Sequence, residues 1–467
     1  MHNDGERAVP YLMAMPHFAE SKLRAWAAGQ TASGMIQEQL GCGCQRGVPP
    51  LTDKACGRVM SDVSSMFLVY LVHMAQGGRM GIVKELWPNA VAAAKWQIDQ
   101  SAQMGVPLKL QTTYDVLGLN AYDTCTYSSL FHILAMRSCS FLAGKLGDAA
   151  QGQACDAAAT RAQDATDARH WVEDGGPPPP GAPSGPGPWP MYRSYCDGGS
   201  GSGCPAGAPN ATMADSTYPQ VIAYTLGFGS LVRNETRLRL HLQTVMQRHM
   251  TPYGMLVMVG RELPYPGSDR DNAVWMMSSP NWASLAISSG LVPFSDVSGA
   301  WPTLERSLSW WRGGDTGAGG KGAHGVAQRN PGGLNDLWNI AGVVGGVNNT
   351  NSGAPWITSH YGYTLTAWRA HLALSGQVVD LSEGSYQFDP KPGIGGRSGT
   401  WPVIFVGGLG SLSIDVDASG AATATIAVVS GPDGGFPLSS VRIGQHTCQA
   451  SPTTITPGSP FVCHYNA

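Results

Sequence analysis

The sequence predicts a mainly α-helical fold, in which a double ring of helices is followed by a small β module. Two observations lead to this prediction. Up to about residue 380, segments that are apolar on nearly every side alternate with amphipathic segments. An inner ring of buried helices surrounded by an outer ring requires such an alternation. From about Gln377 the apolar residues recur at every second position, which is the period of a β-strand.

The first helices show the alternation directly. Residues 61–76, SDVSSMFLVYLVHMAQ, are apolar almost all round, so we expect this helix to be buried on all sides. Residues 81–102 mix large apolar and charged side chains at the spacing of an amphipathic outer helix. Residues 126–148 are again mostly apolar and predict a second inner helix. The apolar positions of the outer helix are Val83, Trp87, Val91 and Trp96.

The end of the chain reads as β-structure. Residues 411–417, SLSIDVD, place Leu412, Ile414 and Val416 on one face of a strand. Cys448 and Cys463 bracket a strand-like segment and could staple a hairpin.

The domain organisation follows from where the spacing of apolar residues changes from helical to strand-like. We expect a helical domain over residues 1–380 and a β module over residues 381–467. Residues 172–209 interrupt the helical domain and are rich in Pro, Gly and Ser. Such a composition predicts an exposed insertion without a packed core of its own.

Composition limits the classes of function. The 29 Lys and Arg nearly balance the 32 Asp and Glu, which argues against a nucleic-acid groove or a polybasic membrane anchor. No apolar run reaches the roughly 18–20 residues that span a bilayer, although peripheral membrane contact stays open. No metal or cofactor is predicted, because neither zinc-type spacing nor a dinucleotide fingerprint stands out. The 14 Trp suit stacking on an uncharged sugar, and they suit an ordinary core equally well.

The cellular compartment is indicated by cysteines and sequons. The chain has ten Cys and three Asn-x-Ser/Thr sequons, at Asn210, Asn234 and Asn348. Together they favour an extracytoplasmic or secretory compartment over the cytoplasm. The first residues, MHNDGERAVPYLMAMPHF, do not have the pattern of a signal peptide.

Polar groups stand before several of the buried helices. If the inner helices run in the same direction, these groups share one rim and converge on one cavity. The alternative is that each Asp is only an N-cap, worth about 1 kcal/mol. The residues concerned are Asp62, Asp115, Asp123, Asp215, Asp269, Asp271, Asn272 and His360.

Three stretches of this region resemble a known family of enzymes. Residues 60–96, residues 112–138 with the motif Thr-Tyr-Asp at 113–115, and residues 213–229 resemble the catalytic region of glycoside hydrolase family 116. That family includes the non-lysosomal glucosylceramidases and related β-glucosidases. The resemblance covers roughly residues 19–376 and implies an (α/α)6 barrel and a retaining β-glycosidase. A carbohydrate or glycolipid substrate is the implied partner.

The resemblance also implies roles for single residues. Asp115 corresponds to the acid/base of the Thr-Tyr-Asp motif, which Thr113 opens, and would protonate the glycosidic oxygen. Asp62 and Asp215 correspond to acids that line the sugar site. The further substrate-binding candidates are Asp271, Trp275 and His360, and Trp282 and Tyr361 are candidate stacking surfaces near the same rim.

Departures from the family keep other mechanisms open. The family's nucleophilic Glu lies upstream of the segment that residues 6–26 resemble, so this chain looks like an N-terminally truncated relative. Because it would lack that nucleophile, we expect weak or no turnover of β-glucosides. A retaining enzyme needs two carboxyl groups about 5 Å apart. One alternative is a catalytically impaired sugar-binding homologue. Another is an inverting glycosidase that pairs Asp115 with Asp62 or Asp215 about 6.5–9.5 Å apart.

Overall fold

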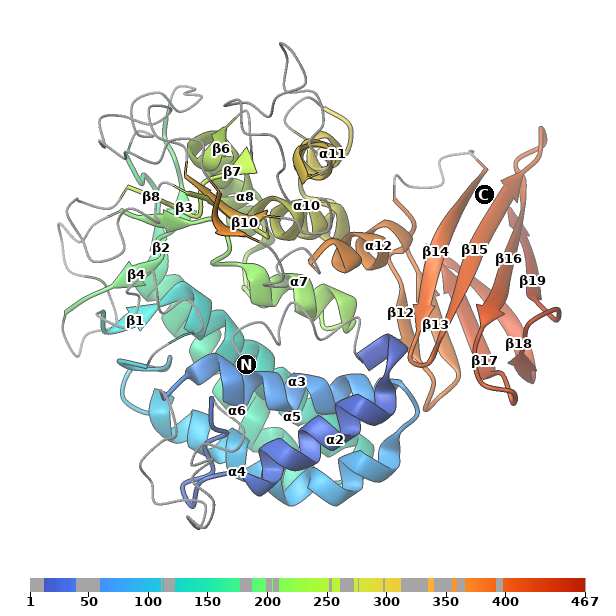
Figure 1. Cartoon of the computed structure of the whole chain (residues 1–467), viewed down its shortest axis with the longest axis horizontal. Coiled ribbons are helices and arrows are strands. Elements are labelled where there is room, and N and C mark those ends of the chain that lie inside the picture. Colours follow the sequence, from blue (N-terminus) through green and yellow to red (C-terminus); the bar gives the residue numbers. More distant parts are fainter. Residues whose placement is uncertain are drawn as a thin grey trace.

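The computed structural model places a helical domain beside an all-β module (Figure 1). The two parts join near residue 377, so a helix-rich region followed by a β region is confirmed. The structure describes residues 12–38, 59–110, 112, 122–176, 187–198, 204, 210–251, 254–260, 273–275, 277–296, 299–311, 335–339, 355–358, 366–391 and 398–466.

The inner helices of the described region pack against one another in chain order. Contacts run from α3 to α5, from α5 to α7, from α7 to α10 and from α10 to α12. All sixteen residues of α3 are buried, which confirms the prediction for residues 61–76. The bounds are α3 (Ser61–Gln76), α5 (Thr126–Leu146), α7 (Tyr218–Thr225), α10 (Ser278–Ser289) and α12 (Ala367–Ser375).

Other helices cover this inner layer. α4 packs on α3 and α5, α6 packs on α5, and α11 packs on α10. In α4, Val83 and Trp96 are buried while Lys84 and Lys95 are exposed, so its amphipathic character is confirmed. A complete ring of six helix pairs stays a prediction, because parts of the region before residue 366 lie outside the described residues. The bounds are α2 (Pro16–Ala28), α4 (Met80–Ser101), α6 (Ala149–His170), α8 (Glu235–His249) and α11 (Ala300–Trp311).

Short strands precede several inner helices and lie on the side of the helical domain away from the β module (Figure 1). β1 directly precedes α5, β5 precedes α7 and β9 precedes α10. The pairs are β1 (Thr124–Cys125) with β4 (Tyr195–Cys196), β2 (Trp171–Val172) with β3 (Met191–Tyr192), β5 (Thr212–Met213) with β8 (Met258–Val259), and β6 (Met250–Thr251) with β7 (Gly254–Met255). A three-stranded sheet joins β9 (Ala273–Trp275), β10 (Asn335–Asn339) and β11 (Pro355–Thr358).

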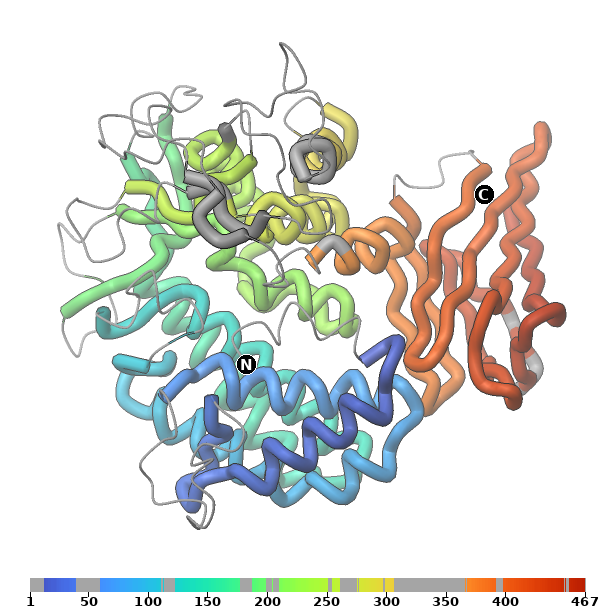
Figure 2. The backbone as a smooth tube through the Cα atoms, in the orientation of Figure 1, coloured from blue at the N-terminus to red at the C-terminus, as the bar shows by residue number. Residues whose placement is uncertain are grey.

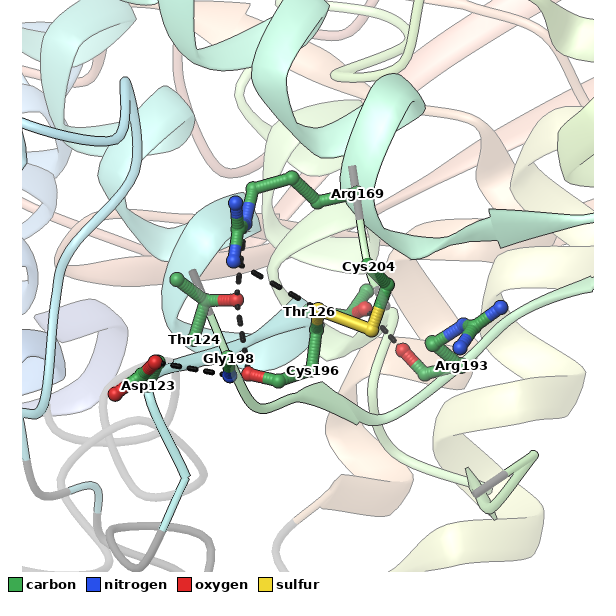
Figure 3. Close-up of a disulfide and its surroundings, with 8 residues drawn as sticks. All are labelled: Asp123, Thr124, Thr126, Arg169, Arg193, Cys196, Gly198 and Cys204. Atoms are coloured by element: carbon green, nitrogen blue, oxygen red, sulfur yellow. Dashed lines mark hydrogen bonds between the residues drawn. A yellow bond between two sulfur atoms is a disulfide. The ribbon is translucent and has the colours of Figure 1, made fainter. Parts of the chain in front are cut away.

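Part of the predicted insertion is buried. Within residues 172–209, β3 and β4 are inaccessible to solvent, and Cys196 forms a disulfide with Cys204. Figure 3 shows Arg169 donating hydrogen bonds to Thr124 and to the Cys196 sulfur beside this disulfide. The expectation of exposure is therefore wrong for Met191–Cys196. Its short strands pair with β1 and β2, a long-range contact that a Pro- and Gly-rich composition does not reveal.

The β module is a sandwich of two four-stranded sheets. Leu412 and Ile414 are fully buried between the sheets and Val416 packs on the same core, as their shared face predicts. One sheet has the order β12 (Val378–Asp380), β13 (Ser385–Phe388), β17 (Phe436–Ile443) and β18 (His446–Ile455). The other has the order β14 (Gly399–Phe405), β15 (Gly408–Val416), β16 (Ala421–Ser430) and β19 (Phe461–Asn466).

The Cys448–Cys463 disulfide joins these two sheets. Cys448 lies in β18, which pairs with β17, whereas Cys463 lies in β19, which pairs with β16. The pairing of the two cysteines is confirmed, but the hairpin is wrong. The chain crosses from one sheet to the other between the two strands, so the bond closes the sandwich across its core.

The β module is attached at the C-terminal ends of inner helices. The Leu381 N–H donates to the carbonyl of Gln76, the last residue of α3, at 2.6 Å. The Gln377 side chain both donates to the Ile404 carbonyl at 2.6 Å and accepts from its N–H at 2.8 Å. Gly77 approaches Val406 so closely that an added Cβ would lie 2.8 Å from it.

Loss of the cross-sheet disulfide should loosen the β module selectively. The bond closes a 15-residue separation, for which chain entropy predicts about 3 kcal/mol of stabilisation. We expect the Cys448→Ser/Cys463→Ser variant to speed amide hydrogen exchange in β16 and β19. The Cys196→Ser/Cys204→Ser variant is the matched control and should leave these amides unchanged. Equal exchange of β16 and β19 in both variants would contradict the prediction.

Candidate functional site

The structure describes five of the residues that sequence reasoning placed at the rim or in the site, namely Asp62, Asp123, Asp215, Trp275 and Trp282. Asp62 lies in the first turn of α3, Asp215 lies three residues before α7, and Trp275 ends β9. Asp115, Thr113, Asp271 and His360 lie outside the described residues.

Asp62 and Asp215 lie at the same end of the inner layer. The C-terminal parts of α3, α7 and α12 come together beside the β module, where His73, Thr225 and Leu372 line one small cavity. These helices therefore run in the same direction, toward the module (Figure 2). Their N-terminal ends lie together at the opposite end, which we call the rim. Asp62 and Asp215 both belong to this rim, and each side chain is only 1% exposed.

Neither Asp62 nor Asp215 occupies the N-cap position of its helix. α3 and α7 have no side-chain hydrogen bond at their N-caps, Met60 and Thr217. The outer helices α6 and α8 differ, because Asp148 and Asn234 cap them in the usual way. The capping alternative is therefore wrong for Asp62 and Asp215, and their burial needs other partners.

Asp215 is held between two inner helices. The Ser278 hydroxyl donates to one carboxylate oxygen at 2.8 Å, and the Asn281 amide donates to the other at 3.1 Å. Both donors lie at the start of α10, whereas Asp215 precedes α7. A buried carboxylate needs such donors, since its burial without them is strongly unfavourable. The two donors fix the orientation of the Asp215 carboxylate, which can then accept further hydrogen bonds in a defined direction.

A second polar group links α3 to α5. The Ser128 hydroxyl accepts from Ser61 at 2.9 Å and from the Cys125 thiol at 3.2 Å. Burial raises the pKa of Cys125, and the nearby charge of Asp62 raises it further. The thiol is therefore kept in its neutral form at the rim, mainly by its burial.

A buried arginine joins α12 to α7. Arg369 is 1% exposed, donates to the Tyr218 hydroxyl at 2.6 Å and lies over its ring at 4.9 Å. Tyr218 is the first residue of α7, so this contact also lies at the rim. Sequence reasoning missed Arg369. The available signal was a single cation inside the otherwise apolar segment AWRAHLAL.

The tryptophans near the rim are packed inside the protein. Trp275 and Trp282 are each 2% exposed. The Trp282 indole donates to the Leu242 carbonyl of α8 at 3.1 Å, so this side chain is directed at an outer helix. Its expected role as a stacking surface for substrate is therefore wrong.

The helical histidines His73, His132 and His241 belong to the core. All three are buried, and burial lowers the pKa of each to about 3. His241 accepts from the Tyr192 N–H at 3.1 Å. Within the described residues, no group of three or more His, Cys, Asp or Glu could hold a metal ion. None of the described helices combines the length and the apolarity that crossing a membrane requires.

Comparison with known proteins gives a likeness in fold. The chain matches no protein-family model and no curated protein. It is similar to the crystal structure of a GH78 family rhamnosidase of Bacillus sp. GL1, with a TM-score of 0.53 and 12% identity over 94% of this chain. It is also similar to an α-L-rhamnosidase from Dictyoglumus thermophilum, with a TM-score of 0.49 and 12% identity over 91% of this chain. The chain spans 38% and 39% of these two proteins, respectively.

Acid should destabilise the helical domain through its buried histidines. Burial lowers the pKa of His73, His132, His170, His241 and His249 to about 3, whereas an unfolded histidine titrates near 6.5. Below pH 6.5 the unfolded chain binds protons that the folded chain does not. Stability is therefore full above pH 6.5 and falls as the pH drops from 6.5 toward 3, by up to about 1.4 kcal/mol per pH unit for each histidine.

Urea unfolding at pH 7.5 and pH 5.5 measures this effect. We expect a clearly lower free energy of unfolding at pH 5.5, and a smaller difference between the two pH values in His170→Phe, which removes one titrating ring. Trp282→Phe is the control, because it disturbs a buried ring that does not titrate and should leave the pH difference unchanged. Equal stability of the unsubstituted protein at both pH values would contradict the prediction.

Proposed function

We propose that the chain is a glycoside hydrolase whose sugar site lies at the rim of the inner helices. The observation that carries the proposal is Asp215, a buried carboxylate that is not the N-cap residue of α7 and is oriented by Ser278 and Asn281. Support comes from the likeness in fold to a GH78 family rhamnosidase, which extends over nearly the whole chain. The proposal includes an (α/α)6 arrangement of the helical domain.

The chemistry of the rim suits an uncharged sugar. The first turns of α-helices carry partial positive charge, which stabilises the carboxylates of Asp62 and Asp215 where they stand. An ionised carboxylate accepts hydrogen bonds from vicinal hydroxyl groups. Asp215 is pre-oriented by two donors, so it binds a hydroxyl without first losing conformational freedom.

Catalysis itself needs a proton donor and a second carboxylate. In the proposal Asp115 is the general acid, on the strength of the Thr-Tyr-Asp motif alone. Asp62 or Asp215 activates water if the enzyme inverts the anomeric centre. The resemblance to family 116 favours a β-linked glucoside as substrate, whereas the likeness in fold favours a rhamnoside.

A second candidate function is sugar binding without hydrolysis. The hydrogen bonds to both oxygens of Asp215 favour it, because two protein donors stabilise the ionised carboxylate and make it a weaker proton acceptor, while its remaining lone pairs can still accept from sugar hydroxyls. In that case the rim binds glycosides without cleaving them.

Replacing Asp215 should strongly reduce turnover while leaving the fold intact. We expect Asp215→Asn to lower kcat/KM by about 100-fold or more on whichever of an aryl β-D-glucoside and an aryl α-L-rhamnoside the protein cleaves. NMR of the first product anomer decides between retention and inversion.

Asp167→Asn is the matched control. Asp167 also accepts a side-chain hydrogen bond, from Tyr192 at 2.7 Å, but it lies on the outer helix α6. The kcat/KM of the Asp167→Asn variant should stay within a few-fold of that of the unsubstituted protein. Full activity of folded Asp215→Asn would refute the assigned role of Asp215. Binding of both glycosides without cleavage of either would support the second candidate function instead.

A further inference from the structure

A second pocket lies where the inner helices meet the β module, at the end opposite to Asp62 and Asp215. Its volume is about 410 Å³, within the range of roughly 300–1,000 Å³ found for small-molecule sites. The last turns of α7 and α10, the residues after α12, strand β13 and the turn from β17 to β18 form its walls. Figure 1 shows the β module beside the ends of α7 and α12. Neither Asp62 nor Asp215 is among the described residues that line this pocket.

Bare backbone forms part of the pocket wall. Gly229 and Gly444 both line it with φ angles of +69° and +57°, which glycine adopts readily and other residues rarely do. A Cβ added at either position would meet no atom of the described residues within 4 Å. The space beside both glycines is therefore open to an occupant.

The pocket offers hydrogen-bond donors and acceptors, and charged groups of both signs. The Arg442 guanidinium lines it and donates one hydrogen bond to the Gln387 side chain at 2.5 Å, which holds the two planar groups together. Asp389 supplies a carboxylate, which pairs with Lys391 at 2.9 Å. The last turns of α7 and α10 add partial negative charge. Since cationic and anionic groups are balanced, neither an anion nor a cation is favoured.

A neutral polyhydroxylated ring matches this surface. Each hydroxyl group both donates and accepts, so one ring can bind the guanidinium and the amide as well as the carboxylate and the backbone carbonyls. The half-buried Tyr224 adds aromatic surface of the kind that packs against the apolar face of a sugar ring. We infer that the pocket binds a single uncharged sugar ring, at a site separate from the candidate active site. This inference does not rest on hydrolytic activity.

The test is a titration of the full chain with methyl β-D-glucopyranoside, methyl α-L-rhamnopyranoside and glycerol, followed by protein NMR. We expect at least one glycoside to shift the amide signals of Gly229 and Gly444 saturably, and glycerol to bind at least tenfold more weakly. The Arg442→Ala/Gln387→Ala variant should weaken the effect at least tenfold. Asp215→Asn should leave it unchanged, which separates this pocket from the rim.

Arg233→Ala is the control, because Arg233 is also an exposed arginine but pairs with Asp164 of the outer helix α6. It should bind like the original, and thermal unfolding should show that all variants are folded. The inference is overturned if neither glycoside shifts the two glycine signals. It is also overturned if glycerol binds as tightly as the sugars, or if the Arg442→Ala/Gln387→Ala variant binds normally.

Discussion

The contact between the β module and the C-terminal ends of the inner helices organises the whole molecule. Helix C-termini leave carbonyl groups without partners inside the helix. The Leu381 N–H supplies one such partner to Gln76, and the reciprocal bonds between Gln377 and Ile404 join the end of α12 to β14. With their C-terminal ends held beside one surface, α3, α7 and α12 must begin at the other. The polar rim is the consequence of this common direction.

The inner and the outer helices are stabilised in different ways at their N-terminal ends. At the rim, polar side chains bond to a neighbouring helix. Ser61 reaches Ser128, Asp215 reaches Ser278, and Arg369 reaches Tyr218. These bonds are buried and connect residues far apart in sequence, so each exists only when the helices are assembled. The outer helices α6 and α8 keep local caps, which need no tertiary partner.

Sequence reasoning succeeded where a local pattern determines the structure. The even apolarity of residues 61–76 predicted complete burial, and the alternation in SLSIDVD predicted one buried face. It failed where the partner is distant in sequence. The segment from Cys448 to Cys463 looks the same in a hairpin and in a crossing between sheets, and only the pairing of β16 with β19 distinguishes them. Asp215 resembled a cap for the same reason, because Ser278 lies 63 residues away.

The contact of Gly77 with Val406 restricts how the two parts of the chain can be inherited. At this point the end of α3 lies so close to Val406, in the loop between β14 and β15, that a Cβ on residue 77 would come within 2.8 Å of the Val406 side chain. A β-sandwich from another protein could pack against the same end of α3 only if its corresponding loop avoided a clash with residue 77. Exchange of C-terminal modules between relatives is therefore sterically penalised, and substitutions at residues 77 and 406 should be correlated during evolution. Correlated substitution of residues 77 and 406 would indicate that the β module evolved together with the helical domain and was not acquired recently by gene fusion.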